Sequence, residues 1–251
     1  MSAFTFGIIN FVCVFGAALT GMFLSTVLPE DHLSPESKDA IKITVGLVST
    51  MAALLLGLLI ASAKSSFDTQ QNRVIEMAAQ VSFVDRTLSS FGPAASESRM
   101  LLRKTVGYAI ERLWPGDRTT RAELRPFTDG GDILYASIQA LAPKDDIQAT
   151  AKALALESAA GTARLFSLIF AQATMRISSK LLVVVVFWVV AIFLSFGLVV
   201  PRNGTVIAAL LVSAAAVSTA LFLVVDLDSS FGGLIGVSGD PLRKAHEQLG
   251  E

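Results

Sequence analysis

The chain has 251 residues, of which 53% are hydrophobic and 16% are charged, and its formal net charge is −1. This composition is too apolar for an ordinary soluble domain, and the small net charge gives no sign of nucleic-acid binding. The single cysteine, Cys13, excludes an intramolecular disulfide and a cysteine-based metal site. We therefore expect a protein embedded in a lipid bilayer, with no metal ion and no cofactor.

Four stretches are long enough to cross a bilayer, which takes about 20 consecutive apolar residues. They cover residues 4–28, 43–63, 181–200 and 205–225, and none contains Asp, Glu, Lys or Arg. The first stretch has no basic residues before it and exceeds the apolar part of a secretory signal, so we interpret it as a span. The four spans form two hairpins around a polar middle region.

The second span is predicted to belong to a much longer helix. Ser34-Pro35-Glu36 is a typical helix start, with Pro at the first helical position. No Pro or Gly follows between residues 64 and 91, and apolar residues recur at helical spacing there. Phe91-Gly92-Pro93 ends the pattern. The 28 residues beyond the span are predicted to form a stalk about 40 Å long.

The rest of the middle region is predicted to be helical as well. A helix over 95–113 is followed by a polar connection over 118–132, which holds a Gly130-Gly131 pair. A short helix over 133–142 comes next, and a last helix runs from Asp145-Asp146 into the third span at Lys180. The expected fold is all-α: four transmembrane helices with an antiparallel helical cytoplasmic domain inserted between spans two and three. Its parts are hairpin one (1–63), the stalk domain (64–180), hairpin two (181–225) and a juxtamembrane loop and tail (226–251).

The distribution of positive charge predicts the orientation. Seventeen of the 20 Lys and Arg residues lie in the middle region and the C-terminal tail, whereas Lys38, Lys42 and Arg202 lie on the other side. Because positive residues are retained in the cytoplasm, we expect both termini and the middle domain to be cytoplasmic.

Small and weakly polar residues recur along one face of the second span. This set is Gly46, Thr50, Ala53, Gly57, Ala61, Lys64 and Asp68, in steps of three and four. Such a face allows close helix packing, which is the ordinary interpretation. It can also line a pore, whose width is set by such residues. The sequence leaves both interpretations open.

Charges cluster at the cytoplasmic ends of the spans. Lys64, Asp68, Asp226 and Asp228 all lie there, and we expect Lys64 to pair with Asp226 or Asp228. The pair is interpreted either as a structural salt bridge between spans two and four or as part of an ion pathway. On the outer side, the turn Pro201-Arg202-Asn203-Gly204 offers Arg202 and Asn203 to anions or to lipid phosphates.

Signals of catalysis or of proton transport are missing from the sequence. It contains no phosphate-binding glycine motif, no metal-ligand spacing and no nucleophile elbow, so no catalytic residue is assigned and no enzyme is expected. No Asp, Glu, His, Lys or Arg lies deep within a span, which argues against a proton-coupled pump.

Several segments resemble one family. They are Gly57-Leu58-Leu59-Ile60-Ala61-Ser62-Ala63-Lys64-Ser65-Ser66-Phe67-Asp68, Val186-Phe187-Trp188, Pro201-Arg202-Asn203-Gly204-Thr205-Val206-Ile207-Ala208-Ala209 and the stretch from Asp226-Leu227-Asp228 through Phe231-Gly232-Gly233 to Pro241-Leu242-Arg243. With these residues the chain resembles the bacterial bestrophin-like membrane proteins over almost its whole length. It departs from the family pattern at Asp226, where Glu is usual, and near Ser230, where Pro is usual.

The resemblance implies an architecture like that of bestrophins, which are pentameric anion channels with four spans per subunit and a neck lined by the second span. It thereby implies a homo-oligomer in the bacterial inner membrane that passes small ions. Bestrophin necks carry bulky apolar residues, so a face with Leu56, Ile60 and Phe67 is the alternative lining here. Our leading hypothesis is an anion channel. The alternative is a non-conducting scaffold or signalling protein that binds a partner through its cytoplasmic helices.

Overall fold

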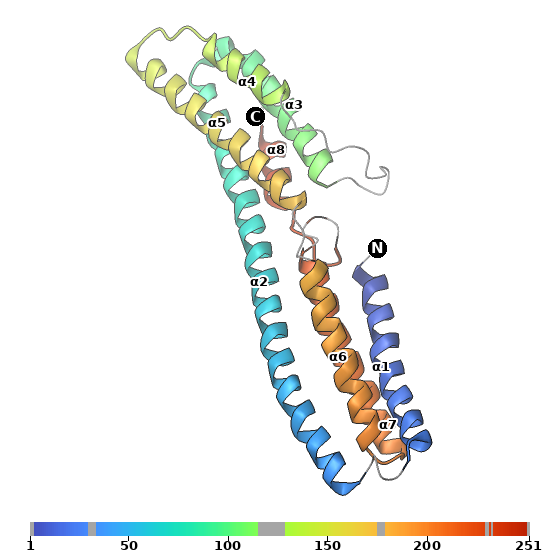
Figure 1. Cartoon of the computed structure of the whole chain (residues 1–251). Coiled ribbons are helices and arrows are strands. Elements are labelled where there is room, and N and C mark those ends of the chain that lie inside the picture. Colours follow the sequence, from blue (N-terminus) through green and yellow to red (C-terminus); the bar gives the residue numbers. More distant parts are fainter. Residues whose placement is uncertain are drawn as a thin grey trace. The chain divides into compact units, whose positions relative to one another are not determined.

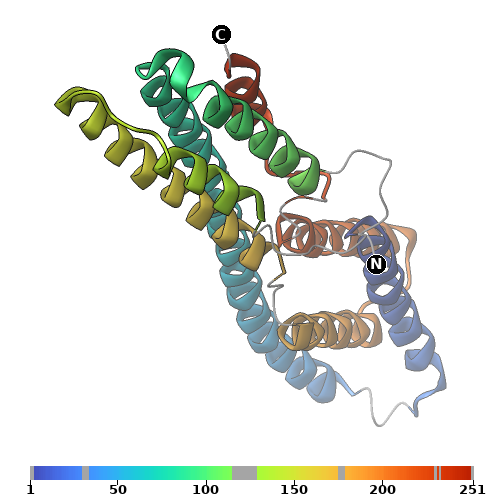
Figure 2. The same ribbon diagram turned by 90° about the horizontal axis from the view of Figure 1, so that it is seen from above.

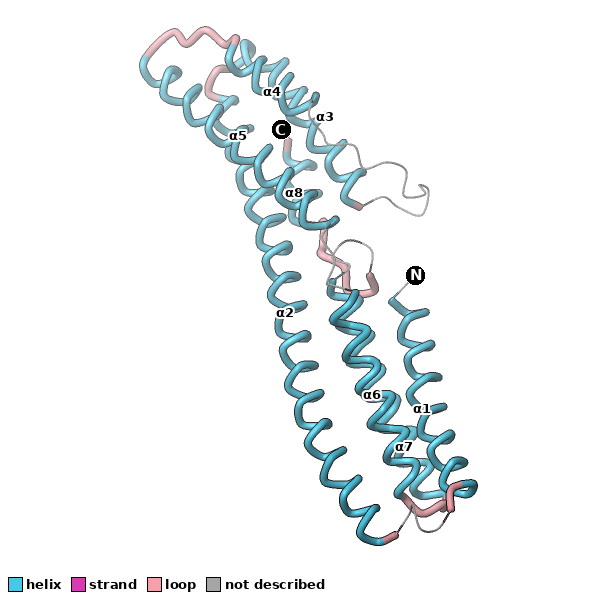
Figure 3. The backbone as a smooth tube through the Cα atoms, viewed as in Figure 1, coloured by secondary structure: helices cyan, strands magenta, loops and turns pink. Residues whose placement is uncertain are grey.

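The structure is a computed structural model that describes residues 3–29, 34–114, 129–174, 179–228, 231 and 233–249. These residues form helices joined by short loops, and no strand occurs among them (Figure 3). The all-helical class that the sequence predicts is confirmed for this part of the chain.

The chain divides into two compact units. The apolar unit consists of Met1–Ser66, Arg176–Ser229 and Gly233–Ile235. The polar unit consists of Phe67–Met175, Ser230–Gly232 and Gly236–Glu251. One helix, α2 (Pro35–Ser89), contributes residues to both units.

The apolar unit contains α1 (Ala3–Val27), the first part of α2, α6 (Ser179–Val199) and α7 (Gly204–Asp228) (Figure 1). α1, α6 and α7 coincide with the first, third and fourth predicted spans to within a few residues at each end, and the predicted second span lies within α2. Five described helices are long and apolar enough to cross a membrane, because α5 (Asp146–Thr174) of the polar unit also qualifies. It is the least apolar of the five.

Two glycines allow α1 and α6 to approach closely. A Cβ atom on Gly21 would collide with the carbonyl oxygen of Leu194, and one on Gly197 would collide with the carbonyl oxygen of Ala18. Because apolar side chains gain little from leaving lipid, helices in a bilayer depend on such close backbone contact. The pair Gly21 and Gly197 therefore fixes where α1 and α6 cross.

A buried polar contact joins α1 to α7. Asn10 Nδ2 donates a hydrogen bond of 3.0 Å to Ser218 Oγ, and both side chains are buried. Close to this bond, a Cβ atom on Gly7 would lie 3.2 Å from Cβ of Phe222. In a helix bundle surrounded by lipid such a bond contributes about 0.6–2 kcal/mol. The contact adds a directional link to the apolar packing of the same helices.

The polar unit is a set of packed helices around its own core. It holds the second part of α2, the 3₁₀ turn η2 (Gly92–Ala95), α3 (Ser96–Leu113), α4 (Asp129–Gln139), α5 and α8 (Asp240–Gln248). α3 lies against α4 and α8, and α4 lies against α5 (Figure 2). The largest fully buried side chains of this core are Met77, Leu88, Leu102, Ile138, Ile169 and Leu242.

Both predicted ends of α2 are confirmed. At its start the Ser34 hydroxyl accepts a 3.2 Å hydrogen bond from the backbone N–H of Ser37, and Pro35 takes the first helical position. Beyond its end Gly92 has a φ of +62°, a conformation that favours glycine. Local chemistry therefore sets both limits of this 55-residue helix.

The sequence prediction is wrong at the Gly130-Gly131 pair. The structure begins α4 at Asp129, so both glycines are helical rather than part of the polar connection. A Cβ atom on Gly131 would lie 3.9 Å from Cβ of Ala163, so α4 passes close to α5 there. Burial of Leu134 and Ile138 offsets the helix penalty of the glycines, about 1 kcal/mol each.

The N-terminus of α5 is capped as the acidic pair predicts. Asp145 Oδ1 accepts a 2.7 Å hydrogen bond from the N–H of Gln148, whose side chain accepts one of 3.0 Å from the N–H of Lys144. The predicted continuation of this helix into the third span falls on residues 175–178, which lie outside the described residues. Most of the predicted connection over 118–132 lies outside them as well.

Candidate functional site

The small face of α2 is exposed along its whole length in the single subunit. We call Gly46, Thr50, Ala53, Gly57 and Ala61 the small stripe, and Lys64 and Asp68 continue it along the same helix. A Cβ atom added to Gly46 or Gly57 would meet no atom within 4 Å. The small stripe therefore makes no close packing contact with the helices of its own subunit at these two glycines.

Apolar side chains flank the small stripe on both sides of the helix. On one side Leu47, Leu54 and Leu58 are 65–72% exposed. On the other side Leu56 and Ile60 are half-buried against the core of the apolar unit. Behind them, opposite the exposed leucines, lies the buried face with Val45, Ala52, Leu59 and Ala63. The small stripe thus lies between two apolar rows.

The alternative lining residues occupy different surroundings. Ile60 packs against the core of the apolar unit, whereas Phe67 packs against the core of the polar unit. Both are half-buried, whereas the residues of the small stripe are exposed. Of the two faces predicted from the sequence, only the small stripe is open along its length in one subunit.

Asp226 is a buried anchor at the end of α7. Its side chain is 1% exposed, and its Oδ1 and Oδ2 accept hydrogen bonds of 2.9 and 2.8 Å from the N–H groups of Leu234 and Ile235. A Cβ atom on Gly233 would lie 2.7 Å from Oδ1, so glycine is needed at that position. The carboxylate lies at the negative end of the α7 dipole, and the two N–H donors compensate for that.

The other charges expected at this end of the spans differ in exposure. Lys64 and Asp68 are exposed on α2, and Asp228 is half-buried in the last turn of α7. The pairing of Lys64 with Asp226 or Asp228 stays a prediction. The two backbone donors on Asp226 are partners that the sequence analysis missed, although the glycines after residue 230 were a local signal for a tight loop.

The outer turn has structural partners. Arg202 Nη2 donates a 3.1 Å hydrogen bond to Ser25 Oγ near the end of α1. Asn203 Oδ1 accepts a 2.8 Å hydrogen bond from the N–H of Val206 and so caps α7. The contact of Arg202 with Ser25 ties the hairpin of α6 and α7 to α1. A role of Arg202 and Asn203 in attracting anions stays a prediction.

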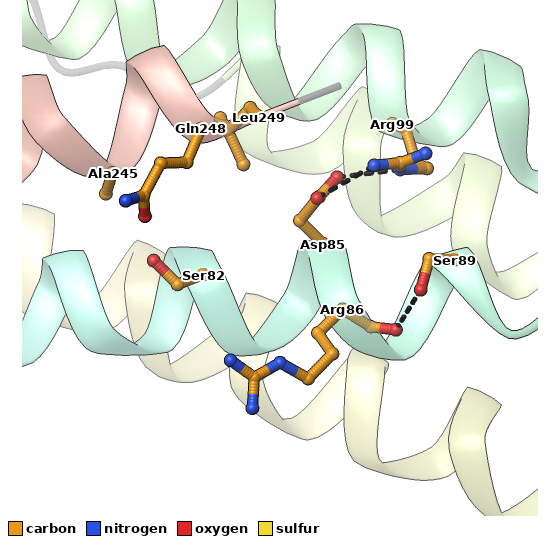
Figure 4. A pocket seen from close by; sticks show the side chains of 8 residues that line it. All are labelled: Ser82, Asp85, Arg86, Ser89, Arg99, Ala245, Gln248 and Leu249. Carbon is orange, nitrogen blue, oxygen red and sulfur yellow. Dashed lines mark hydrogen bonds and ion pairs between the residues drawn. The ribbon is translucent and has the colours of Figure 1, made fainter. Parts of the chain in front are cut away.

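A pocket of about 330 Å³ in the polar unit was not predicted (Figure 4). Its lining comes from α2, α3, α8 and the residue after α8: Ser82, Asp85, Arg86, Ser89, Arg99, Ala245, Gln248 and Leu249. Arg99 Nε and Nη2 donate hydrogen bonds of 2.8 and 2.9 Å to the two oxygens of Asp85. The hydrogen bonds that Arg99 donates to the Asp85 carboxylate raise the pKa of Arg99. Because the two charges satisfy each other, this pair acts as a joint between α2 and α3.

A shallow groove follows the exposed side of α3. It is lined by Met100, Arg103, Lys104, Gly107, Tyr108 and Glu111 of α3 and by His246 of α8. At Gly107 the imidazole of His246 lies close to the α3 backbone, because a Cβ atom on Gly107 would lie only 3.1 Å from His246 Nε2. Among the described residues, no group of three or more His, Cys, Asp or Glu side chains is placed to hold a metal ion.

Comparison with known proteins decides the family. The model of the bestrophin-like domain matches residues 12–242. The chain belongs to the bestrophin-like family. Among curated proteins none matches this bestrophin-like chain.

A solved structure shows the same fold. The crystal structure of a mutant bacterial bestrophin homologue from Klebsiella pneumoniae superposes with a TM-score of 0.65 at 13% sequence identity. The match covers 94% of the bestrophin-like chain and 97% of the homologue. At this identity the likeness describes the fold alone. Family and apolar helices together make the bestrophin-like chain a membrane protein, as its composition predicts.

Proposed function

We propose that the protein is a homo-oligomeric ion channel, with α2 of each subunit around a central pore that passes anions. The observation that carries this proposal is the small stripe of α2, exposed between two apolar rows. A helix that lines a water-filled pore needs a narrow, uncrowded face toward the axis and apolar flanks toward its neighbours. Membership of the bestrophin-like family supports the same arrangement.

The subunit is proposed to cross the bacterial inner membrane four times, through α1, α2, α6 and α7, with both termini in the cytoplasm. α5 is assigned to the cytoplasmic domain although its length would allow a span. It carries Lys152, Glu157 and Arg164 along its length, and it buries Ala155 and Ile169 in the core of the polar unit. Charged side chains along its length and a face buried in the polar unit are not expected of a helix that faces lipid. Five subunits are the expected number, by analogy with bestrophins.

The proposed lining is the small stripe with Lys64 and Asp68 at one end. Ile60 and Phe67 are assigned to the edge of the lining, because each is partly buried against its own subunit. Asp226 is proposed to support the inner mouth of the pore by holding the loop with Leu234 and Ile235 in place. Asp228 is assigned to the rim of the inner mouth. Arg202 and Asn203 are assigned to the outer rim. The proposal includes no enzymatic step and no cofactor.

Reconstitution tests this function directly. The purified full chain is placed in liposomes, and chloride flux is measured under concentration gradients and applied voltage, with protein-free liposomes as the control. Mass photometry in lipid nanodiscs gives the subunit number, and we expect a closed ring of about five copies. Absence of flux under every gradient and voltage, with intact rings in the membrane, contradicts the proposal.

The groove on α3 supports a second candidate function. Its lining combines exposed Met100 and Tyr108 with Arg103 and Lys104, a composition that suits contact with a protein partner. In that case the protein is a non-conducting scaffold or signalling component that binds its partner through the cytoplasmic helices. A monomer or dimer in nanodiscs, together with silent liposomes, favours this second function over the channel.

A further inference from the structure

Ile147 and Met100 are the two most exposed large apolar side chains in the described part of the polar unit. Ile147, in the first turn of α5, is 77% exposed, and Met100 of α3 is 66% exposed. Among the described residues of this unit, no other large apolar side chain exceeds 54%. Because both remain uncovered, they do not meet within one subunit. Contiguous apolar surface of this kind marks a contact site, and exposed Tyr108 extends the surface around Met100.

The groove on α3 carries two positive charges and one negative charge beside Met100. Arg103, Lys104 and Glu111 line it, and all three are exposed. Within the described part of the chain, none of these three side chains forms a hydrogen bond or an ion pair. The groove therefore presents charges that have no partner in their own subunit.

The turn between α4 and α5 carries the opposite set of charges beside Ile147. We call residues 144–147 the α4–α5 tip. Lys144, Asp145 and Asp146 are exposed there, and one oxygen of Asp145 accepts the N–H that caps α5. In the polar unit, the α4–α5 tip lies at one edge and the last turns of α3 lie at the opposite edge (Figures 1 and 2). The tip thus presents two carboxylates and one ammonium group, where the groove presents two cations and one carboxylate.

We infer that the α4–α5 tip of one subunit docks into the groove on α3 of a second copy of this chain. Ile147 then covers Met100 and Tyr108, and the two carboxylates of the tip face Arg103 and Lys104. Complementary charges of this kind determine the choice of partner and the register of the contact more than its strength. The inference rests on the proposed homo-oligomer and is independent of ion conduction.

The tip and the groove are different surfaces, so the contact between copies is heterologous. Each subunit gives its tip to one neighbour and receives the tip of the other neighbour. Heterologous contacts generate a closed ring when the rotation between copies closes. In such a ring every groove is filled, so Ile147 and Met100 are covered in each copy.

Cysteine cross-linking of the full chain in lipid nanodiscs tests the contact. Met100→Cys and Ile147→Cys are introduced together into a Cys13→Ser background, and a short bismaleimide is added. We expect a ladder of covalent multimers on denaturing gels, because every subunit is linked to two neighbours. The matched controls carry only one of the two cysteines in the same background. They are expected to stay monomeric on these gels, since like positions do not meet in a heterologous contact.

Charge reversal tests whether the opposite charges hold the contact in register. Arg103→Glu in the double-cysteine chain is expected to lower the cross-linking yield by about fivefold or more, and adding Asp146→Arg is expected to restore most of it. Arg164→Glu makes the same substitution at an exposed position of α5 outside the tip and the groove. This control is expected to leave the yield unchanged.

Ring mass in nanodiscs separates this inference from the proposed homo-oligomer. Rings of unchanged mass whose double-cysteine chains stay monomeric on denaturing gels overturn the contact and leave the homo-oligomer standing. A ladder from either single-cysteine control overturns it as well, because like surfaces then meet. A ladder that Arg103→Glu does not diminish overturns the role of the charges. Wild-type protein that is monomeric in nanodiscs overturns both the contact and the homo-oligomer.

Discussion

At Gly21 and Gly197 the absence of a side chain allows two helices to come into close backbone contact. The two residues lie on α1 and α6, and each faces a backbone carbonyl of the other helix. Gly16, on α1 as well, faces open space, because a Cβ atom there would meet nothing within 4 Å. Gly21 therefore leaves no room for a side chain, whereas Gly16 on the same helix does, and variants at the two positions can measure this difference.

We expect Gly21→Ala to destabilise the protein, because the methyl group forces α1 and α6 apart. Overpacking of this kind costs about 1–3 kcal/mol, and in a chain of this size it lowers the melting temperature by roughly 2–10 °C. Gly16→Ala is the matched control and is expected to be neutral or slightly stabilising, since Ala favours the helix. Thermal unfolding in detergent measures both. Equal melting temperatures for the two variants contradict the proposed close contact.

For Asp226 the sequence predicts the location of the charge correctly but misses two of its hydrogen-bond partners. The sequence places it at the end of a span and suggests Lys64 as a partner. The structure gives its two oxygens to the backbone N–H groups of Leu234 and Ile235. Backbone donors leave no mark in a side-chain pattern, so charge counting does not find them.

At the scale of helices, the long α2 follows from local signals. Ser34 and Pro35 set its start, and Gly92 sets its end. The start of α4 does not follow from such signals, because packing on α5 outweighs the low helix propensity of Gly130 and Gly131. Local chemistry decides an element boundary only where tertiary contact does not compete with it.

Trp114 connects the end of α3 to the segment that follows α7. Its Nε1 donates a 2.8 Å hydrogen bond to the carbonyl oxygen of Val237, and its ring meets the ring of Phe231 edge-on with centroids 5.5 Å apart. A Cβ atom on Gly239 would lie 2.9 Å from the same indole. The indole thus holds this segment against α3 at three points.

We expect Trp114→Phe to loosen that segment, since a buried carbonyl loses its donor at a cost of about 1–3 kcal/mol. Hydrogen exchange of the amides of residues 233–239 measures the effect and is expected to accelerate. Trp188→Phe on α6 makes the same chemical change in the apolar unit and is expected to leave this exchange unaltered. Unchanged protection in Trp114→Phe shows that the indole hydrogen bond does not hold the segment.

At the scale of the whole molecule, the exposed face of α2 carries the functional proposal. Gly57→Leu adds a bulky side chain where the subunit has open space, so its own fold is expected to remain stable. If the small stripe lines the pore, a ring of leucines closes it and chloride flux falls to the background of protein-free liposomes.

Gly16→Leu is the control for this experiment, because Gly16 also lies on a transmembrane helix with open space around it. It is expected to keep wild-type flux and ring mass. Full flux through Gly57→Leu rings rules out the small stripe as the narrow part of the pore.

The sequence by itself determined the membrane class, the positions of the apolar helices and the length of α2, because hydropathy and helix ends are local properties of the chain. It also identified the small face of α2, since helical periodicity decides which residues share a face. Only the tertiary structure decided that this face is open in the subunit, that Gly21 meets α6 and that Asp226 binds backbone N–H groups. These contacts join residues through the folding of the chain, and no periodicity within one helix encodes them.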